Sequence, residues 1–224
     1  MSSVNSTLFH KYICRAAGIS ILFFFNTLLN AQISKLEVFD LVKSDSPVFI
    51  YERWVTFPDK VPAVKAREIK SEFTVRTTIH ELIDILQDET QVKNWQTHVT
   101  EFKIFPGDTA YWLEYSYHDI PWPVSDQDHF LKYQLIEKVP DKKVFIRFQS
   151  VSDPKLAPLK NGVARMELTG SWLFEQVSPR QVNVTYRILS MPSNIPRMFT
   201  DPVVRSNLLS TIKALTKLAE EKNN

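Results

Sequence analysis

Hydrophobic and polar residues alternate along most of the chain between residues 48 and 189, which is the pattern of β-strands that bury one face. The alternation predicts strands at 48–55, 66–75, 100–105, 110–118, 127–135, 144–151, 163–174 and 182–189. Clusters of Pro, Gly, Asp and Ser separate these strands, and Pro106-Gly107-Asp108 is typical of a hairpin turn between the third and the fourth. We therefore expect an antiparallel sheet.

Three segments instead repeat their apolar residues at the spacing of a helix. The first covers residues 34–43. The second covers residues 79–87 and follows Thr77 and Thr78, either of which can cap it. Glu81 lies three residues after Thr78, as it does in a capping box.

The third and longest helix is predicted to begin at Asp201, a capping residue, and Pro202, which suits the first helical position. Its apolar stripe includes Leu208 and continues to Leu218. A curved antiparallel sheet needs a cover for its apolar face, and this helix is the obvious one. The order of elements therefore indicates an α+β fold.

Residues 1–31 have a different pattern from the rest of the chain. Lys11 and Arg15 precede an uncharged run, and small or polar residues follow it up to Ala31. This is typical of a secretory signal peptide cleaved near Ala31, because the run is shorter than the roughly 20 residues of a membrane span. An uncleaved anchor is the alternative. We expect an exported protein, periplasmic or secreted, with a single domain over residues 32–224.

Removal of this leader changes the charge and the cysteine content. The whole chain has 27 Lys and Arg against 25 Asp and Glu, and loss of Lys11 and Arg15 leaves 25 of each sign. A domain without net charge lacks the electrostatic attraction that draws nucleic acid or an anionic membrane. Cys14 is the one cysteine in the sequence, so the domain after the leader has no thiol chemistry. We predict no nucleic-acid partner, no metal and no cofactor.

The segment Asp119-Ile120-Pro121-Trp122-Pro123-Val124-Ser125-Asp126-Gln127-Asp128 is the most distinctive in the chain. Its two prolines fix φ and remove backbone donors, so neither a helix nor a central strand continues through it. On these grounds it is a rigid corner with a buried Trp122. The segment also resembles the Pro-Trp-Pro-Val-Ser-Asp-Arg-Asp signature of START domains, the steroidogenic-acute-regulatory-related lipid-transfer modules. Gly170-Ser171-Trp172 and the order of elements are similar to that family as well, from about Leu36 to Leu218.

The resemblance implies a helix-grip fold of the Bet v 1-like superfamily. In that fold a curved antiparallel sheet wraps a long C-terminal helix and encloses a hydrophobic cavity, which the helix gates. It further implies a START-like lipid-binding domain, a lipid or other hydrophobic small molecule as the ligand, transient contact with a membrane, and a monomer.

The residues expected to contact the ligand come from several parts of the chain. Trp95 is proposed from the resemblance alone, and it could equally plug the core. The others share a face of a predicted strand or lie on or before the last helix. The full set is Trp95, Tyr115, Tyr117, Gln127, His129, Leu131, Tyr133, Met166, Leu168, Met198, Phe199 and Leu208.

The chain departs from the family at one chemically important position. Gln127 stands where the signature has Arg, and in the family that Arg projects into the cavity and often pairs with an acid. We therefore expect a ligand to meet a neutral hydrogen-bonding group there rather than a cation. Arg165 faces away from Met166 and Leu168 by alternation, so it is not expected to contact a ligand. The segment Met191-Pro192-Ser193-Asn194 also differs from the Asp-Pro-Gly-Gly-like turn that the family has before its last helix.

Three functions are compatible with these observations. The first is a non-catalytic lipid-binding protein, whose apolar pocket needs a few polar groups. The second is an enzyme on the same scaffold, similar to the cyclases and hydrolases among helix-grip proteins, which would use Asp126, Asp128 and His129 as acid–base groups. The third is an interaction module with a filled core. We predict the first, with no catalytic residue.

Overall fold

A computed structural model of the protein describes residues 38–57, 63–122, 125–190 and 197–222, without the side chains of residues 197–200 and 203. Apart from Val38, the described residues belong to one compact unit. The predicted leader, residues 1–31, lies outside them. Export and cleavage near Ala31 therefore stay predictions, which the intact mass of the protein from its own host would test.

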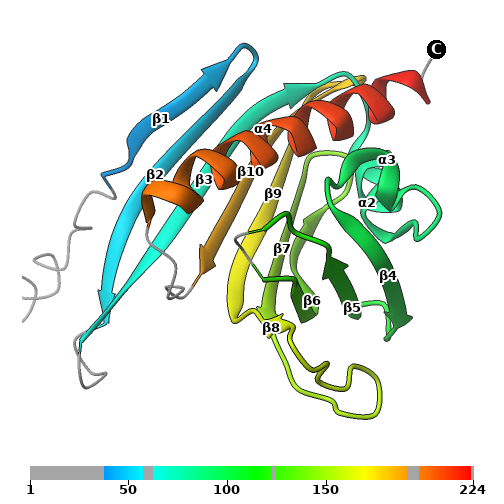
Figure 1. Ribbon diagram of the computed structural model, residues 1–224. Coiled ribbons are helices and arrows are strands. Elements are labelled where there is room, and N and C mark those ends of the chain that lie inside the picture. Colours follow the sequence, from blue (N-terminus) through cyan, green and yellow to red (C-terminus); the bar gives the residue numbers. More distant parts are fainter. Residues whose placement is uncertain (1–37, 58–62, 123–124, 191–196, 223–224) are drawn as a thin grey trace, which may run out of the picture. The chain divides into compact units, whose positions relative to one another are not determined.

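Among the described residues, ten strands form one sheet in the order β1-β2-β3-β10-β9-β7-β6-β5-β4 (Figure 1). A short strand, β8, pairs in parallel with the beginning of β6, and the other pairings are antiparallel. The strands are β1 (Asp40–Asp45), β2 (Val48–Phe57), β3 (Val64–Val75), β4 (Val99–Pro106), β5 (Tyr111–His118), β6 (Gln127–Val139), β7 (Lys143–Ser150), β8 (Ala164–Arg165), β9 (Leu168–Ser178) and β10 (Gln181–Ser190). The predicted α+β class and the predicted antiparallel sheet are confirmed.

Three helices accompany the sheet in the described part of the chain: α2 (Ile79–Gln87), α3 (Val92–Trp95) and α4 (Arg197–Glu221). In Figure 1, α4 runs across one face of the sheet, and α2 and α3 lie together near the strand β4. The predicted capping box of α2 is present, because the Thr78 hydroxyl accepts from the Glu81 amide and the Glu81 carboxylate accepts from the Thr78 amide. None of the described helices has the length and apolar character needed to cross a membrane.

The two halves of α4 are attached to the sheet by different forces. Ile212, Leu215 and Ala219, in its second half, are fully buried in the core of the sheet. Its first half is held by ions, since Arg205 donates to Glu52 of β2 at 2.6 Å and Asp201 accepts from Arg67 of β3 at 2.6 Å. The hydrophobic half contributes more, because burial of each large aliphatic side chain is worth about 1.5–3 kcal/mol.

The first predicted helix, residues 34–43, is wrong where it can be checked. Residues 40–43 belong to β1, which pairs with β2 in the register Asp40↔Glu52 and Lys43↔Ile50. The apolar spacing at these positions is compatible with a helix, but pairing with an adjacent strand satisfies the backbone instead. Residues 34–37 lie outside the description.

Two other boundaries differ from the prediction. The single strand expected at 163–174 is divided into β8 and β9, because its first part pairs with β6 and its second part pairs with β7 and β10. Helix α4 begins at Arg197 rather than after Asp201, so Pro202 lies inside it. Pro202 is the sixth residue of the helix, beyond the first turn, so it removes one backbone hydrogen bond of α4 and destabilises the helix locally.

The aromatic residue of the Pro-Trp-Pro corner is also placed differently from the prediction. Trp122 is 91 % exposed, not buried. Pro121 beside it is exposed as well, whereas Pro123 and Val124 lie outside the described residues. The corner itself is present, because β5 ends at His118 and β6 begins at Gln127.

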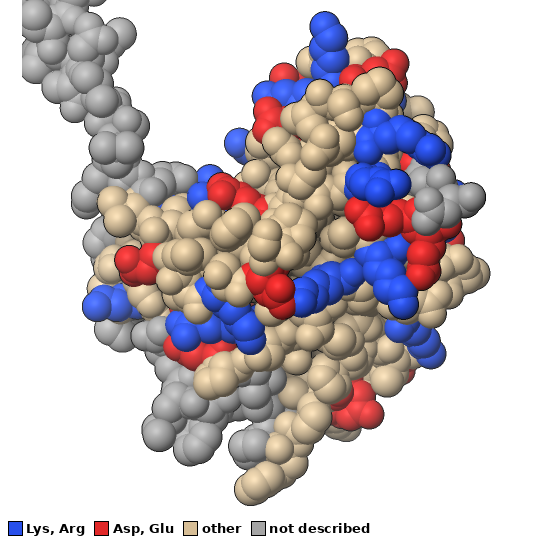
Figure 2. Space-filling view, turned by 90° about the horizontal axis from the view of Figure 1, so that it is seen from above, with Lys and Arg blue, Asp and Glu red and all other residues tan. Residues whose placement is uncertain are grey.

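Basic and acidic residues are mixed on the face of the molecule that Figure 2 shows. On the face shown in Figure 2, Lys and Arg side chains lie next to Asp and Glu side chains and do not form a patch of one sign. This mixture agrees with the equal counts of the two signs after residue 31.

Candidate functional site: a cavity under the C-terminal helix

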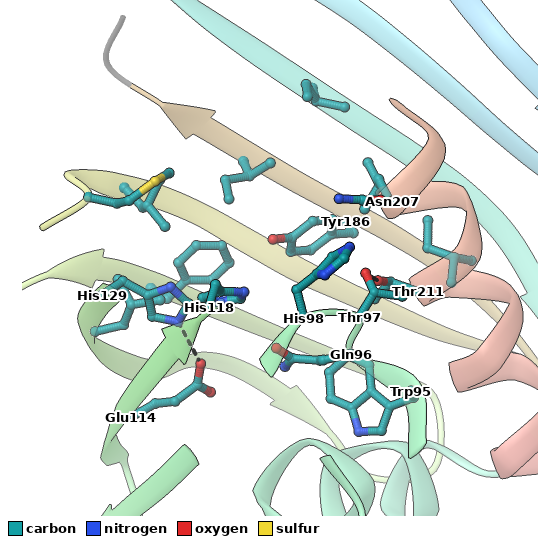
Figure 3. Close-up of a pocket in the computed structure, with 18 of the residues that line it drawn as sticks. Trp95, Gln96, Thr97, His98, Glu114, His118, His129, Tyr186, Asn207 and Thr211 are labelled. Carbon is teal, nitrogen blue, oxygen red and sulfur yellow. Dashed lines mark hydrogen bonds and ion pairs between the residues drawn. The ribbon is translucent and has the colours of Figure 1, made fainter. Parts of the chain in front are cut away.

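A cavity of about 290 Å³ lies between the concave face of the sheet and α4 (Figure 3). Its walls come from β3, β5, β6, β7, β9, β10, α2, the segment around α3 and the part of α4 between Val204 and Leu215. The apolar lining consists of Ile69, Leu86, Trp95, Ile120, Leu131, Phe148, Met166, Leu168, Trp172, Ile188, Val204, Leu208, Ile212 and Leu215. The polar lining consists of Gln96, Thr97, His98, Glu114, His118, Gln127, His129, Tyr133, Tyr186, Asn207 and Thr211.

The pairing of β5 with β6 determines which side chains reach the cavity. Residues directly opposite one another in an antiparallel pair project from the same face. The pairs Glu114↔Leu131 and His118↔Gln127 therefore belong to the cavity face together, as does His129, which is opposite Ser116. This register places one carboxylate, two imidazoles and one amide at the same end of the cavity.

Glu114 is the most strongly buried charged group in the lining, with 4 % of the residue exposed. Its Oε1 lies 3.2 Å from Nε2 of His129 and accepts the hydroxyl of Tyr133 at 3.4 Å. Among the described residues that line the cavity, none is Lys or Arg. Glu114 is therefore held by an imidazole and a phenol, without a permanent cation.

His118 lies beside this pair, and its ring centroid is 5.2 Å from that of His129. Burial lowers the pKa of His118 to about 3, and electrostatic interaction with the neighbouring imidazoles of His129 and His98 lowers it further. The His118 ring is consequently uncharged at neutral pH. Burial also raises the pKa of Tyr133 well above its usual value, and the nearby Glu114 adds to that effect. Tyr133 therefore keeps its proton and can donate.

Eight of the residues predicted to contact a ligand line this cavity. They are Trp95, Gln127, His129, Leu131, Tyr133, Met166, Leu168 and Leu208. Figure 3 shows Trp95 and His129 at opposite parts of the wall. Contact with a ligand remains a prediction for all eight. The side chains of Met198 and Phe199 lie outside the described residues.

Tyr115 and Tyr117 do not face the cavity, so their prediction as wall residues is wrong. They alternate with Glu114 and His118, and therefore project from the opposite face of the sheet. There Tyr115 packs with Phe130 and Ala157 in a second, smaller hydrophobic cluster. Both faces of β5 are covered by other parts of the protein. The aromatic residues on one face of this strand therefore did not show which face turns toward the cavity.

The carboxylates of the alternative enzyme site also lie on the outer face. Asp128 accepts two hydrogen bonds from Arg165, at 2.7 and 2.9 Å, and a third from the Tyr115 hydroxyl at 3.2 Å. Asp126 accepts from the Tyr117 hydroxyl at 2.6 Å and from the Ile120 amide at 3.1 Å. These bonds fix the corner between β5 and β6, and Arg165 is not among the residues that line the cavity under α4.

Asp126, Asp128 and His129 are thus not brought together, because consecutive residues of a strand project to opposite faces. The residues that do join His129 are His118 and Glu114, and Glu114 was not selected from the sequence. The cross-strand register could have identified Glu114. Ser116 pairs with His129 and Glu114 pairs with Leu131, so this face of β5 turns toward the cavity when His129 and Leu131 do. Among the described residues, no group of three or more His, Cys, Asp or Glu could hold a metal ion.

Comparison with known proteins gives one relative in sequence and several in structure. No family model matches the chain. An uncharacterized protein of Pseudomonas aeruginosa is 28% identical over 143 residues, which cover 62% of this chain and 69% of that protein. A crystal structure of a STAR-related lipid transfer protein from Xanthomonas axonopodis is 24% identical, with a TM-score of 0.67 over 81% of this chain and 98% of that one.

Two other solved structures, one human and one bacterial, have a similar architecture at lower identity. The human StAR-related lipid transfer protein 5 is 16% identical, with a TM-score of 0.68 over 91% of this chain and 96% of that one. The Zhui aromatase/cyclase from a Streptomyces species is 12% identical, with a TM-score of 0.52 over 71% and 96%. At these identities the similarity establishes the fold. The chain has the helix-grip fold of the START, or StAR-related, lipid-transfer domains.

Proposed function

We propose that this protein is a START-type lipid-binding domain that holds a hydrophobic small molecule between its sheet and α4, without catalysis. The observation that carries the proposal is the cavity itself, which is mainly apolar and has its one carboxyl side chain grouped with two imidazoles at one end. Its volume of about 290 Å³ lies at the lower limit of the roughly 300–1,000 Å³ of ligand sites. The proteins with lipid transfer in their names that have this fold support the same function.

Helix α4 supplies the gate in this proposal. Leu208, Thr211 and Ile212 form one wall of the cavity, so a ligand can leave if the first part of α4 moves away. That part is attached through the ion pairs of Arg205 and Asp201, whereas Leu215 and Ala219 anchor the second part in the core. The described side chains of α4 between residues 201 and 211 include none that is fully buried, so local opening is expected to begin there rather than in the buried apolar half.

A cavity-filling substitution tests the proposal. Native mass spectrometry of the protein purified from its own host should show a bound lipid, and Leu208→Trp should reduce the bound fraction at least about tenfold, because the larger ring occupies the ligand volume. Ser210→Trp is the matched control, since Ser210 lies exposed on the same helix. Amide exchange in residues 201–212 should become faster after the lipid is removed from the wild type.

Two results would contradict the proposal. Wild-type protein from the host without any bound lipid, together with exchange in α4 that no added lipid changes, would indicate a filled core and an interaction module. Equal occupancy in Leu208→Trp and Ser210→Trp would place the ligand somewhere other than this cavity.

An enzyme is the second candidate, and one observation favours it. Glu114, His118 and His129 lie together on the wall of the cavity, and a carboxylate beside an imidazole is a common acid–base arrangement. An aromatase/cyclase also has this fold. Turnover of a defined substrate that is lost in His129→Gln, with folding intact, would favour the enzyme over the carrier.

A further inference from the structure

Four carboxylates are buried among the described residues, and three of them have an arginine. Glu52 pairs with Arg205 at 2.6 Å, Glu68 with Arg187 at 2.6 Å, and Asp128 with Arg165 at 2.7 Å. An arginine partner is the usual compensation for a buried carboxylate. The fourth carboxylate, Glu114, has instead His129 at 3.2 Å and Tyr133 at 3.4 Å.

Both contacts of Glu114 are made by the same oxygen, Oε1. Among the described residues, none donates a hydrogen bond to Oε2. Since Glu114 belongs to the cavity wall, this oxygen offers hydrogen-bond acceptor capacity to whatever the cavity holds. Figure 3 shows the carboxylate at the end of the cavity where His118 and His129 also lie.

The other polar groups of this end do not attract an anion. His118 is uncharged at neutral pH because burial lowers its pKa to about 3. Gln127 is neutral, and the nearest nitrogen of His129 is directed at Glu114. The described lining therefore has one carboxyl side chain and no Lys or Arg that could balance a second.

We propose that the cavity selects ligands with a head group that donates a hydrogen bond to Glu114, a hydroxyl or an ammonium, and rejects carboxylate and phosphate head groups. This inference rests on the proposed function. A second anion near Glu114 would be repelled where little water screens the charge, whereas a donor satisfies the second carboxylate oxygen. An ammonium group would additionally place a cation beside Glu114, and the described lining has no Lys or Arg to do so.

The test uses ligands that share one hydrocarbon chain and differ only in the head group. Binding of 1-decanol, decylamine, decanoate and decyl phosphate to the delipidated full-length protein is measured by calorimetry at neutral pH. Decanol and decylamine should bind at least about tenfold more tightly than decanoate and decyl phosphate. If decylamine exceeds decanol, Glu114 acts mainly as a counter-ion; equal affinities indicate a hydrogen bond alone.

Glu114→Gln tests the assignment to this side chain, because it removes the charge and keeps the shape. The preference for decanol over decanoate should fall to within about threefold, mainly through tighter binding of decanoate. Glu101→Gln is the control, since Glu101 is exposed and pairs with Lys160. Its head-group preference should equal that of the wild type.

The outcomes separate this inference from the function on which it rests. Binding of decanoate by the wild type as tight as that of decanol overturns the head-group selection and leaves the carrier intact, even if Glu114→Gln does not fold. A preserved preference in a folded Glu114→Gln variant also overturns it. If the host protein contains no lipid and none of the four ligands binds, the proposed function itself fails.

Discussion

Glu114 and Asp128 are buried carboxylates on the neighbouring strands β5 and β6, and they lie on opposite faces of the sheet. Asp128 is 1 % exposed and receives three hydrogen bonds, two of them from the Arg165 guanidinium. Glu114 is 4 % exposed and faces an imidazole and a phenol at the longer distances of 3.2 and 3.4 Å. The outer carboxylate is fully compensated by the protein, and the inner one is not.

Under the proposed function, this difference separates a structural role for Asp128 from a ligand-facing role for Glu114. The Asp128–Arg165 pair joins β6 to β8 and stabilises the corner that carries Trp122. Within the described residues, the Glu114 carboxylate is hydrogen-bonded only to His129 and Tyr133 of the neighbouring strand β6. Its burial lowers the stability of the fold, because a buried carboxylate without a Lys or Arg partner is poorly solvated. Polar groups that the fold does not need, in a cavity that the fold encloses, are typical of a binding site.

The largest effect is expected from breaking the outer pair. Asp128→Asn should lower the free energy of unfolding by about 3 kcal/mol, because it leaves Arg165 without its partner in a partly buried position. Glu114→Gln, the matched change on the inner face, should alter it by less than about 1 kcal/mol, because the lost contact with His129 is offset by relief of a buried charge. Urea unfolding of both variants measures the difference. Equal losses would mean that Glu114 is as much a structural residue as Asp128.

A smaller effect is expected from the protonation of His118, which is buried on the inner face of the sheet. The pKa of His118 falls from 6.5 to about 3 on folding, so the unfolded chain binds a proton between these values that the folded chain does not. Stability contributed by neutral His118 is therefore complete above pH 6.5 and is lost as the pH falls toward 3. At pH 5 the loss should be about 1–2 kcal/mol.

His118→Gln removes this titration, so its stability should vary less between pH 7 and pH 5 than that of the wild type. Urea unfolding at the two pH values gives the comparison, with His80→Gln as the control because His80 is exposed. A wild type and a His118→Gln variant with the same pH dependence would show that His118 is not buried uncharged.

Sequence alone predicted the fold well, because its evidence is local and periodic. Alternation located the long strands, and Thr78 with Glu81 located the start of α2. The failures came where the packing of one element on another decides the outcome, which local periodicity does not report. Residues 40–43 have a helical spacing of apolar residues, yet they pair with β2 as part of the sheet. Trp122 is exposed, although two prolines and an aromatic residue suggested a packed corner.

The site was predicted on β6 and missed on β5, for a physical reason. In β6 one face combines His129 with Leu131 and Tyr133, and it was correctly taken as the inner face. In β5 both faces are covered, the inner one by the core and the outer one by Phe130 and Ala157. Alternation then defines two faces but not their direction. The direction follows from the register with β6, which becomes evident only when the two strands are paired.

The smallest effect is the sharpest comparison, because one substitution can be made on each face. Tyr115 donates its hydroxyl to Asp128 at 3.2 Å on the outer face, and Tyr133 donates to Glu114 at 3.4 Å on the inner face. Tyr115→Phe should cost about 1 kcal/mol of unfolding free energy, the usual value of a hydrogen bond to a buried group, and leave the affinity for decanol unchanged. Tyr133→Phe should cost less unfolding free energy, because its hydrogen bond is longer. It should also raise the affinity for decanol a few fold, because Glu114 loses one donor and offers more acceptor capacity to the ligand.

Unfolding in urea and calorimetric titration of both variants give the two readouts. If Tyr115→Phe altered the binding of decanol and Tyr133→Phe did not, the ligand would have to lie on the outer face, and the assignment of the cavity to the inner face would be wrong.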